Sequence, residues 1–265
     1  MDRTMYLGAN GGAGPSPSVW GYAPVLDVVL DPNEGYALLV DFVNGLPNVD
    51  SQAADGGAGV TAVSELGGAC KITTGGTDNN EAIVQFGGAD AAAVFRISDG
   101  AGEQKKLFFE CRVKADTVTD AKAGFFVGLA ASGVAAADGL IADDGTLADK
   151  DLIGFFRPEG DGDGVDFVYR KNGQAVQTAI ADVATIAADT YVKLGFIYDP
   201  AAVASKKIAV FVNGVEQNTY VTAANIAAAT FPDAVLLQAA AGIKTAEDVD
   251  HNIQLGGFVR VLQLR

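Results

Sequence analysis

The passage Thr190–Gln217, TYVKLGFIYDPAAVASKKIAVFVNGVEQ, constrains the fold of this chain more than any other. Two runs with strand character flank a short polar loop, and the second run leads directly into Asn213-Gly214. An Asn-Gly pair between β-branched residues is the strongest short-range hairpin signal, because both central residues of a type I′ turn need a positive φ. The passage therefore predicts antiparallel β structure.

Other strands are predicted at regular spacing along the chain. In Leu107–Lys114, apolar residues alternate with Glu110, Arg112 and Lys114, which is typical of a half-buried strand. The remaining predicted strands are 36–42, 69–73, 82–86, 93–97, 125–129, 152–157, 165–170, 174–179, 191–198, 207–212 and 253–264. Each of two Ala-rich pieces, 179–188 and 222–229, is either one helical turn or a loop. Short strands joined by Gly, Asn and Asp turns indicate a sandwich or barrel and not alternating βαβ units.

The first 55 residues differ from the rest of the chain. They contain the turn-rich stretch Gly11–Ser18 and two short apolar runs broken by Asp31–Gly35. We expect a loose, extended N-terminal arm to about residue 34 and a first strand soon after it. Residues 1–55 are thus assigned to the arm with its first strand, and residues 56–265 to the sandwich.

The chain is strongly acidic, with 33 Asp and Glu against 18 Lys and Arg and a formal net charge of −15 over 265 residues. Such a surface repels phosphate, so we expect neither nucleic acid nor an anionic membrane as a partner. The length suits one large all-β domain. The charge is explained either by solubility or by attraction to cations or a basic partner surface.

Only two cysteines occur, Cys70 and Cys111, and each lies inside a predicted strand. Two cysteines in a chain of this length do not make a disulfide framework, so we expect buried free thiols. The first residues, MDRTMYLGANGGAG, have no apolar stretch of signal-peptide length, which fits synthesis in the cytoplasm.

The predicted hairpin resembles the central hairpin of concanavalin A-like jelly rolls. Tyr191–Tyr198 is followed by Asp199 and then by Ile208–Val215, a passage similar to one in laminin G-like and pentraxin-like domains. The resemblance covers residues 65–265 and implies an all-β, antiparallel jelly-roll sandwich. Because this fold hosts lectins, glucanases and structural proteins alike, it does not imply one function.

No sequence pattern indicates catalysis. Glucanases of this fold use an E-x-D-x-x-E pattern, which the chain lacks. The acidic group Glu247–Asp250 has the wrong spacing and is interpreted as a solvated loop. His251 is the only histidine, and nothing near it in the sequence suggests an activated nucleophile, so we expect it at the surface or at a strand edge. The chain is predicted not to be an enzyme.

Calcium is the one ion that the sequence suggests, although no cofactor is required by it. Asp161, Asp163 and Asp166 alternate with glycines in a loop, and carboxylate oxygens suit a hard cation. A second acidic loop carries Asp138, Asp143 and Asp144. The alternative is that Asp-Gly pairs only make tight turns.

Three residues of the arm, Trp20, Tyr22 and Pro24, are candidates for binding a protein partner, since aromatic anchors dominate interface energetics. They could instead stack on a sugar or pack back on the chain's own sandwich.

Two functions remain open. The composition, with its arm, also resembles that of bacteriophage virion proteins of this fold. This resemblance implies a structural virion protein that decorates or cements a capsid. Its expected partner is the major capsid protein or another virion protein, its expected state is a homo-oligomer, and its location is the virion after synthesis in the host cytoplasm. The alternative is a carbohydrate-binding, lectin-like module that depends on calcium.

Overall fold

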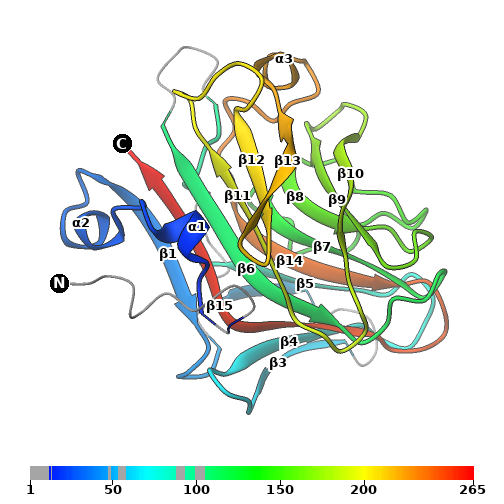
Figure 1. The fold of residues 1–265 in the computed structure, drawn as a ribbon. Helices are drawn as coiled ribbons and strands as arrows, with labels where there is room; N and C mark the ends of the chain where they lie inside the picture. The colour runs from blue at the N-terminus through cyan, green and yellow to red at the C-terminus, as the bar shows by residue number, and fades with distance from the viewer. Residues whose placement is uncertain (1–11, 13, 47–48, 53–57, 88–92, 99–104) are drawn as a thin grey trace.

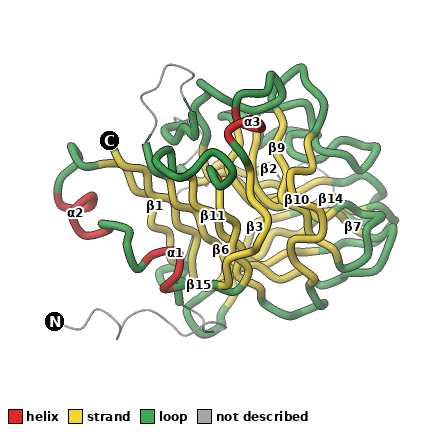
Figure 2. Tube along the Cα trace, turned by 45° about the horizontal axis from the view of Figure 1, so that its top comes forward, coloured by secondary structure: helices red, strands yellow, loops and turns green. Residues whose placement is uncertain are grey.

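The computed structural model describes residues 12, 14–46, 49–52, 58–87, 93–98 and 105–265. Their strands form two antiparallel sheets that pack face to face as a sandwich (Figures 1 and 2). Three short helices lie at its periphery: α1 (Pro17–Trp20), α2 (Val25–Leu30) and α3 (Ala223–Ile226). The predicted fold class is thus confirmed.

The first sheet has eight strands and is built around β15 (Asn252–Leu264). The early part of β15 pairs with β4 and the later part with β1, so the sheet branches along this one strand. Its path runs β13 (Val215–Val221), β12 (Ile208–Val212), β11 (Val192–Tyr198), β6 (Leu107–Ala115), β15, β4 (Ala69–Thr73) and β3 (Gly59–Val63), with β1 (Gly35–Asp41) off the path.

The second sheet has seven strands. Its order is β10 (Gln177–Thr185), β9 (Gly164–Arg170), β8 (Leu152–Arg157), β7 (Ala123–Ala130), β14 (Gln238–Thr245), β5 (Glu81–Phe86) and β2 (Val49–Gln52). The sandwich therefore takes β1 and β2 from residues before the predicted boundary at 55/56.

The main core lies between the two sheets and is rich in phenylalanine. Phe109 and Phe196 of the first sheet stack with ring centroids 5.2 Å apart. Phe167 of the second sheet meets Phe196 edge-on at 5.4 Å. Such pairs add to the hydrophobic stabilisation of the core. Cys70 and Cys111 lie in this core as buried free thiols, which confirms that prediction.

A second apolar cluster covers the opposite face of the seven-stranded sheet. There, Leu140, Ile141 and Leu147 of the loop between β7 and β8 pack on Phe126 and Phe156. Strands β7, β8 and β14 are consequently buried on both faces. Because such strands show no apolar-polar alternation, β14, with the sequence QAAAGIKT, was not predicted.

Residues 14–34 do not form an extended arm. They fold as α1 and α2 against the outer face of the eight-stranded sheet, which Figure 1 shows in blue. Val19 and Trp20 of α1 pack on Phe108, Phe211 and Leu262. The expectation of a loose arm is therefore wrong for these residues, because their apolar side chains find a complementary patch on the chain's own sheet.

Most predicted strands and turns are present, and two assignments are wrong. Asn213 and Gly214 have φ of +50° and +77°, and they connect Val212 to its partner Val215 as a type I′ turn requires. Residues 93–97 form only an isolated bridge and no strand. Residues 179–188 are mostly the strand β10, whereas 222–229 do contain the helical turn α3.

Candidate functional site

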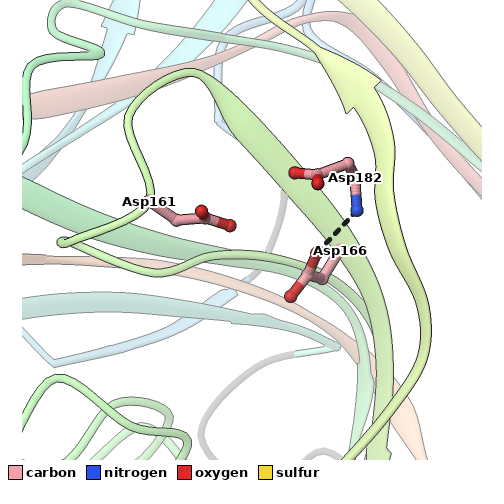
Figure 3. A group of neighbouring side chains, drawn as sticks. All are labelled: Asp161, Asp166 and Asp182. Carbon is pink, nitrogen blue, oxygen red and sulfur yellow. Dashed lines mark hydrogen bonds between the residues drawn. The ribbon is translucent and has the colours of Figure 1, made fainter.

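An acidic group lies at the end of the seven-stranded sheet, where β8 turns into β9. It consists of Asp161 in the turn, Asp166 on β9 and Asp182 on β10. One carboxylate oxygen from each lies within 4.8 Å of the others, and the side chains point toward a common centre (Figure 3). This geometry suits a hard cation, which prefers carboxylate oxygens from loops.

An irregularity in β10 brings Asp182 into the group. Ile180 pairs with Phe167 and Ala184 with Val165, so three residues of β10 face Asp166 alone. Such a bulge bends the strand and redirects side chains, and bulges are common next to functional sites. Asp182 itself has a φ of +47°, which is unusual for a residue other than glycine.

Glycine at position 164 keeps the space between the carboxylates open. A Cβ at Gly164 would lie 2.4 Å from Oδ1 of Asp182 and 3.2 Å from Oδ2 of Asp161. Both distances are shorter than ordinary van der Waals contacts. A side chain there would therefore push apart the groups that define the site.

The three carboxylates repel one another electrostatically. Burial raises the pKa of Asp166, and the negative charges of Asp161 and Asp182 raise it further, while the backbone N–H of Asp182, which donates to Asp166 Oδ1 at 2.8 Å, acts in the opposite direction. Arg157 lies near but donates to backbone carbonyl oxygens, such as that of Gly162 at 2.6 Å. A bound divalent cation would relieve the repulsion.

The predicted metal set is thus changed by one residue. Asp161 and Asp166 belong to the group, but Asp163 does not, and its backbone carbonyl accepts a hydrogen bond from Ile186 at 3.0 Å. Asp182 was missed because it follows Asp166 by 16 residues and lies in a piece predicted as a helical turn or a loop. Only the pairing of β9 with β10 brings it close.

The second acidic loop forms ion pairs with a buried lysine. Nζ of Lys244, whose side chain is 1% exposed, lies 2.5 Å from Asp138 and 2.6 Å from Asp143. Glu81 of β5 accepts backbone N–H groups of Gly139 and Ile141 in the same loop. These carboxylates are already paired, so they hold the loop against the sheet.

The three candidate partner-binding residues of the arm, Trp20, Tyr22 and Pro24, differ in their exposure. Trp20 is 4% exposed and donates its indole N–H to Glu110 Oε2 at 2.8 Å, so it is not available to a partner and packs on the chain's own sandwich. Tyr22 is 93% exposed, and Pro24 is half-buried. Glu110 lies on the outer face of β6, as its alternation predicts, but α1 covers it and leaves it buried.

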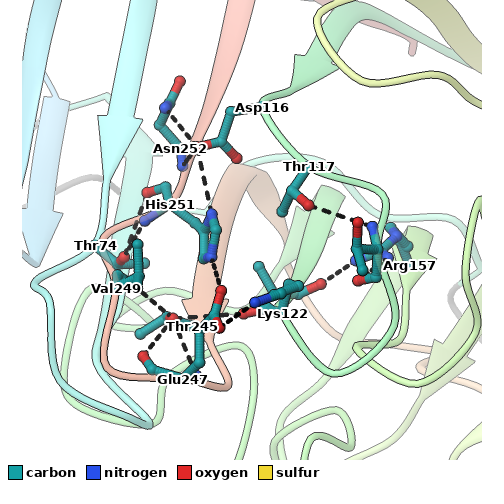
Figure 4. A network of polar contacts seen from close by, with 12 residues as sticks. Thr74, Asp116, Thr117, Lys122, Arg157, Thr245, Glu247, Val249, His251 and Asn252 are labelled. Atoms are coloured by element: carbon teal, nitrogen blue, oxygen red, sulfur yellow. Dashed lines mark hydrogen bonds and ion pairs between the residues drawn. The ribbon is translucent and has the colours of Figure 1, made fainter.

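His251 belongs to a polar network at the turn between β14 and β15 (Figure 4). Its Nε2 lies 2.9 Å from Glu247 Oε1, and its Nδ1 lies 3.5 Å from Asp116 Oδ2. The histidine is 8% exposed and directly precedes β15, so the expected surface position is wrong. In the acidic group 247–250, Glu247 is half-buried against His251, whereas the other three residues are exposed, as expected of a solvated loop. Through Asp116, the residue that follows β6, the network connects the turn to that strand.

The two antiparallel sheets and their strand order define a jelly-roll sandwich. No protein-family model matches the sequence. No curated protein matches it either. No helix in the described part of the chain has the length and apolar character needed to span a membrane.

Solved structures with this fold include three whose chains are covered almost completely. The carbohydrate recognition domain of Emp47p has a TM-score of 0.53 at 10% identity, over 89% of this chain and 98% of that one. Peanut lectin has a TM-score of 0.52 at 15% identity, over 88% and 99%. An endo-β-1,4-glucuronan lyase from the fungus Trichoderma reesei has a TM-score of 0.51 at 13% identity, over 86% and 93%. The chain therefore has a concanavalin A-like, legume-lectin-like fold.

Proposed function

We propose that this protein is a carbohydrate-binding, lectin-like module. In it, a calcium ion bound by Asp161, Asp166 and Asp182 orders the turn between β8 and β9. The observation that carries the proposal is the convergence of these three carboxylates at a sheet end of a concanavalin A-like sandwich. Two of the solved structures with this fold are carbohydrate-recognition proteins, which supports the same function.

The chemistry of the group favours calcium over the other common ions. Calcium takes six to eight oxygen ligands in flexible geometry, and three carboxylates supply between three and six of them. Water or sugar hydroxyls would complete the shell. Protein zinc sites usually include histidine nitrogen or cysteine sulfur, and neither lies in this group of three aspartates.

The first test is thermal unfolding with calcium chloride and with a chelator. At a calcium concentration of 100 times Kd, binding to the folded state alone adds about 2.7 kcal/mol. For a chain of this size that raises Tm by roughly 5–10 °C. Asp182→Asn should abolish the increase. The matched control is Asp163→Asn, which changes a neighbouring aspartate outside the group and should keep it.

The second test is a glycan array probed with and without chelator. Glycan binding that requires calcium and is lost in Asp182→Asn would support the proposal. Glycan binding that is unaffected by the chelator and by Asp182→Asn would show that calcium has no part in the function. An array without any bound glycan, together with no calcium effect on Tm, would refute it.

The other predictions have less support. The virion location, the capsid partner and the homo-oligomer stay predictions, since no described feature of the fold favours them. Because one structure with this fold is a polysaccharide lyase, the prediction that the chain is not an enzyme also stays open to an activity assay.

A further inference from the structure

The β7–β8 loop, residues 131–151, closes on itself over the face of the seven-stranded sheet that points away from the main core. Its two ends meet where the N–H of Ala131 donates to the carbonyl oxygen of Asp151 at 2.8 Å. Connections longer than about 12–15 residues without a helix or strand are uncommon in compact domains, and they are usually functional, as lids or binding loops. The length and closed shape of this loop therefore call for a physical explanation.

The backbone of the β7–β8 loop is hydrogen-bonded to itself. Within the described part of the chain, every backbone–backbone hydrogen bond of the loop joins two of its own residues. The N–H of Ala142 donates to Thr146 at 2.8 Å, and that of Ala148 donates to Leu140 at 2.9 Å. Because none of these bonds reaches the sheet, all of them would survive if the loop moved away as a unit. Such a segment can open separately from strands that are paired on both sides.

Side chains of the sheet hold the loop near its two ends. Gln85 of β5 donates to the carbonyl oxygen of Ala131 at 2.8 Å. Arg170 of β9 donates to the carbonyl oxygen of Leu147 and lies 3.2 Å from Oδ1 of Asp149. These contacts fix the ends of the loop, so they mark where it would hinge.

The middle of the loop is held by a separate latch, made by Glu81 and Lys244. The carboxylate of Glu81, which is 1% exposed, accepts the N–H groups of residues 139–141 at 2.8–3.2 Å. Nζ of Lys244 lies 2.5 Å from Asp138 and 2.6 Å from Asp143. Both latch side chains come from the sheet, and both bind the same short part of the loop.

An aromatic surface lies under the loop. Phe126 and Phe156 belong to the same apolar cluster as Leu140 of the loop, and both rings are buried. Gly128 and Gly154 face each other across β7 and β8, and a Cβ on either would lie 2.9 or 3.1 Å from Cζ of Phe126. The ring of Phe126 therefore lies close against the backbone of this glycine pair, and opening of the loop would expose it.

The buried carboxylate makes the strength of the latch depend on pH. Burial raises the pKa of Glu81 to about 7, whereas the N–H groups of residues 139–141 and the charge of Lys244 act in the opposite direction. Opening of the loop would return Glu81 to its usual pKa of about 4.5, so opening releases a proton between these two pH values. The closed form is thus favoured at the acidic end of this window and loses that advantage as the pH rises through about 7. The other charged groups around the latch are Asp78, Asp138, Asp143, Asp144 and Glu159.

We propose that residues 131–151 form a lid that leaves the outer face of the seven-stranded sheet as one unit, with Glu81 and Lys244 as its latch. Opening breaks the latch, keeps the hydrogen bonds inside the loop and uncovers the aromatic surface at Phe126 and Phe156. The lid thus controls access to that surface. It is independent of the proposed carbohydrate-binding function, because it uses none of the three aspartates of the acidic group.

Native-state hydrogen exchange of the full chain, followed by NMR at increasing urea concentration, tests the lid. The amides of residues 139–141 bond the latch, so they should exchange together and with a weaker urea dependence than the amides of β7 and β14. The amides of Ala142 and Ala148 bond inside the loop and should exchange more slowly than those of residues 139–141. Exchange of residues 139–141 with the same urea dependence as β7 would mean that they open only by global unfolding, and would overturn the lid.

A pH series of the same measurement tests the role of Glu81. Relative to the amides of β7, and corrected for the intrinsic exchange rate, the protection of residues 139–141 should fall by at least about tenfold between pH 5 and pH 8. Glu81→Gln removes the titrating group and should remove this fall. A fall of the same size in Glu81→Gln, or no fall in the unaltered protein, would overturn the part assigned to Glu81.

Lys244→Met tests the other half of the latch. It removes the cation that pairs with Asp138 and Asp143, and should lower the protection of residues 139–141 by at least about tenfold while β7 keeps its own. Lys122→Met is the matched control, because that lysine pairs with Glu247 in the turn after β14 and lies outside the lid. Equal loss in both variants, or no loss in Lys244→Met, would overturn the latch. If either latch variant does not fold, the urea series on the unaltered protein still decides whether the lid opens as a unit.

Discussion

Replacing Trp20 with alanine should release the segment of residues 14–34 from the outer face of the eight-stranded sheet. The indole is 4% exposed, packs against Phe108 with ring centroids 6.0 Å apart, and hydrogen-bonds the buried carboxylate of Glu110. Helices α1 and α2 contact this outer face and not the core between the sheets. The loss should therefore be local, with the sandwich still folded.

The size of the effect follows from what the indole buries. A buried tryptophan removes 150–250 Å² from water, worth roughly 4–6 kcal/mol at about 25 cal/mol per Å². Truncations of buried Phe and Trp cost about 3–5 kcal/mol in practice. The hydrogen bond to a carboxylate is worth about 1.5–3 kcal/mol by itself, but part of it is already included in such measurements. We expect a loss of about 3–5 kcal/mol, or a rise of two to four decades in the local opening equilibrium.

Hydrogen exchange followed by mass spectrometry measures this opening directly. Peptides from residues 14–34 should lose protection in Trp20→Ala, while peptides from β7, β8 and β14 keep theirs. Tyr22→Ala is the matched control, because that side chain is 93% exposed and should not affect protection. Unchanged protection of residues 14–34 in Trp20→Ala, or equal loss in both variants, would refute the reasoning.

Four further predictions test other parts of the fold. Burial raises the pKa of Glu110 above its usual value of about 4.5, so at pH values between the unfolded and the folded pKa the folded chain holds a proton that the unfolded chain has released. Its contribution to stability therefore falls as the pH rises through that window, and Glu110→Gln should reduce the fall, as measured by urea unfolding at pH 5 and pH 8. Gly154→Ala would place a Cβ 2.5 Å from the carbonyl oxygen of Val127, so denaturant unfolding should show a loss of at least about 2 kcal/mol. Burial raises the pKa of Cys70 to about 12 and raises that of Cys111 as well, so a thiol reagent should modify both only as the chain unfolds. Asn213→Ala keeps a turn residue at a φ of +50° without an asparagine side chain, which should cost about 1–2 kcal/mol in thermal unfolding.

The parts of this fold that local sequence governs were predicted well. The type I′ turn at Asn213-Gly214 needs only two residues with positive φ, and the sequence contains the pair that prefers it. The alternation in Leu107–Lys114 marks one strand face for the core, and β6 has that face in the core. Both signals depend on neighbours along the chain.

The predictions that were wrong or missed concern residues whose burial or pairing depends on distant parts of the chain. Glu110 follows the alternation to the outer face, yet α1 covers it. The pattern around Glu110 cannot predict this burial, because Trp20 of α1 lies 90 residues away in the sequence. Strand β14 is buried on both sides, so its residues lack the period of two. Strand β10 carries a bulge that breaks its period as well.

The acidic group was likewise predicted only in part. Asp161 and Asp166 lie five residues apart, and their spacing was enough to suggest a cation. Asp182 joins them only through the bulged pairing of β10 with β9.

The sequence alone thus determined the class of fold, the main turns and the state of the thiols, because hydrophobic period and turn chemistry are properties of short stretches. The tertiary structure decided which carboxylates share a site and how residues 14–34 pack on the eight-stranded sheet. Those outcomes depend on contacts between segments that are distant in the sequence. The free energy of such contacts comes from both packed faces together, so no single segment predicts it.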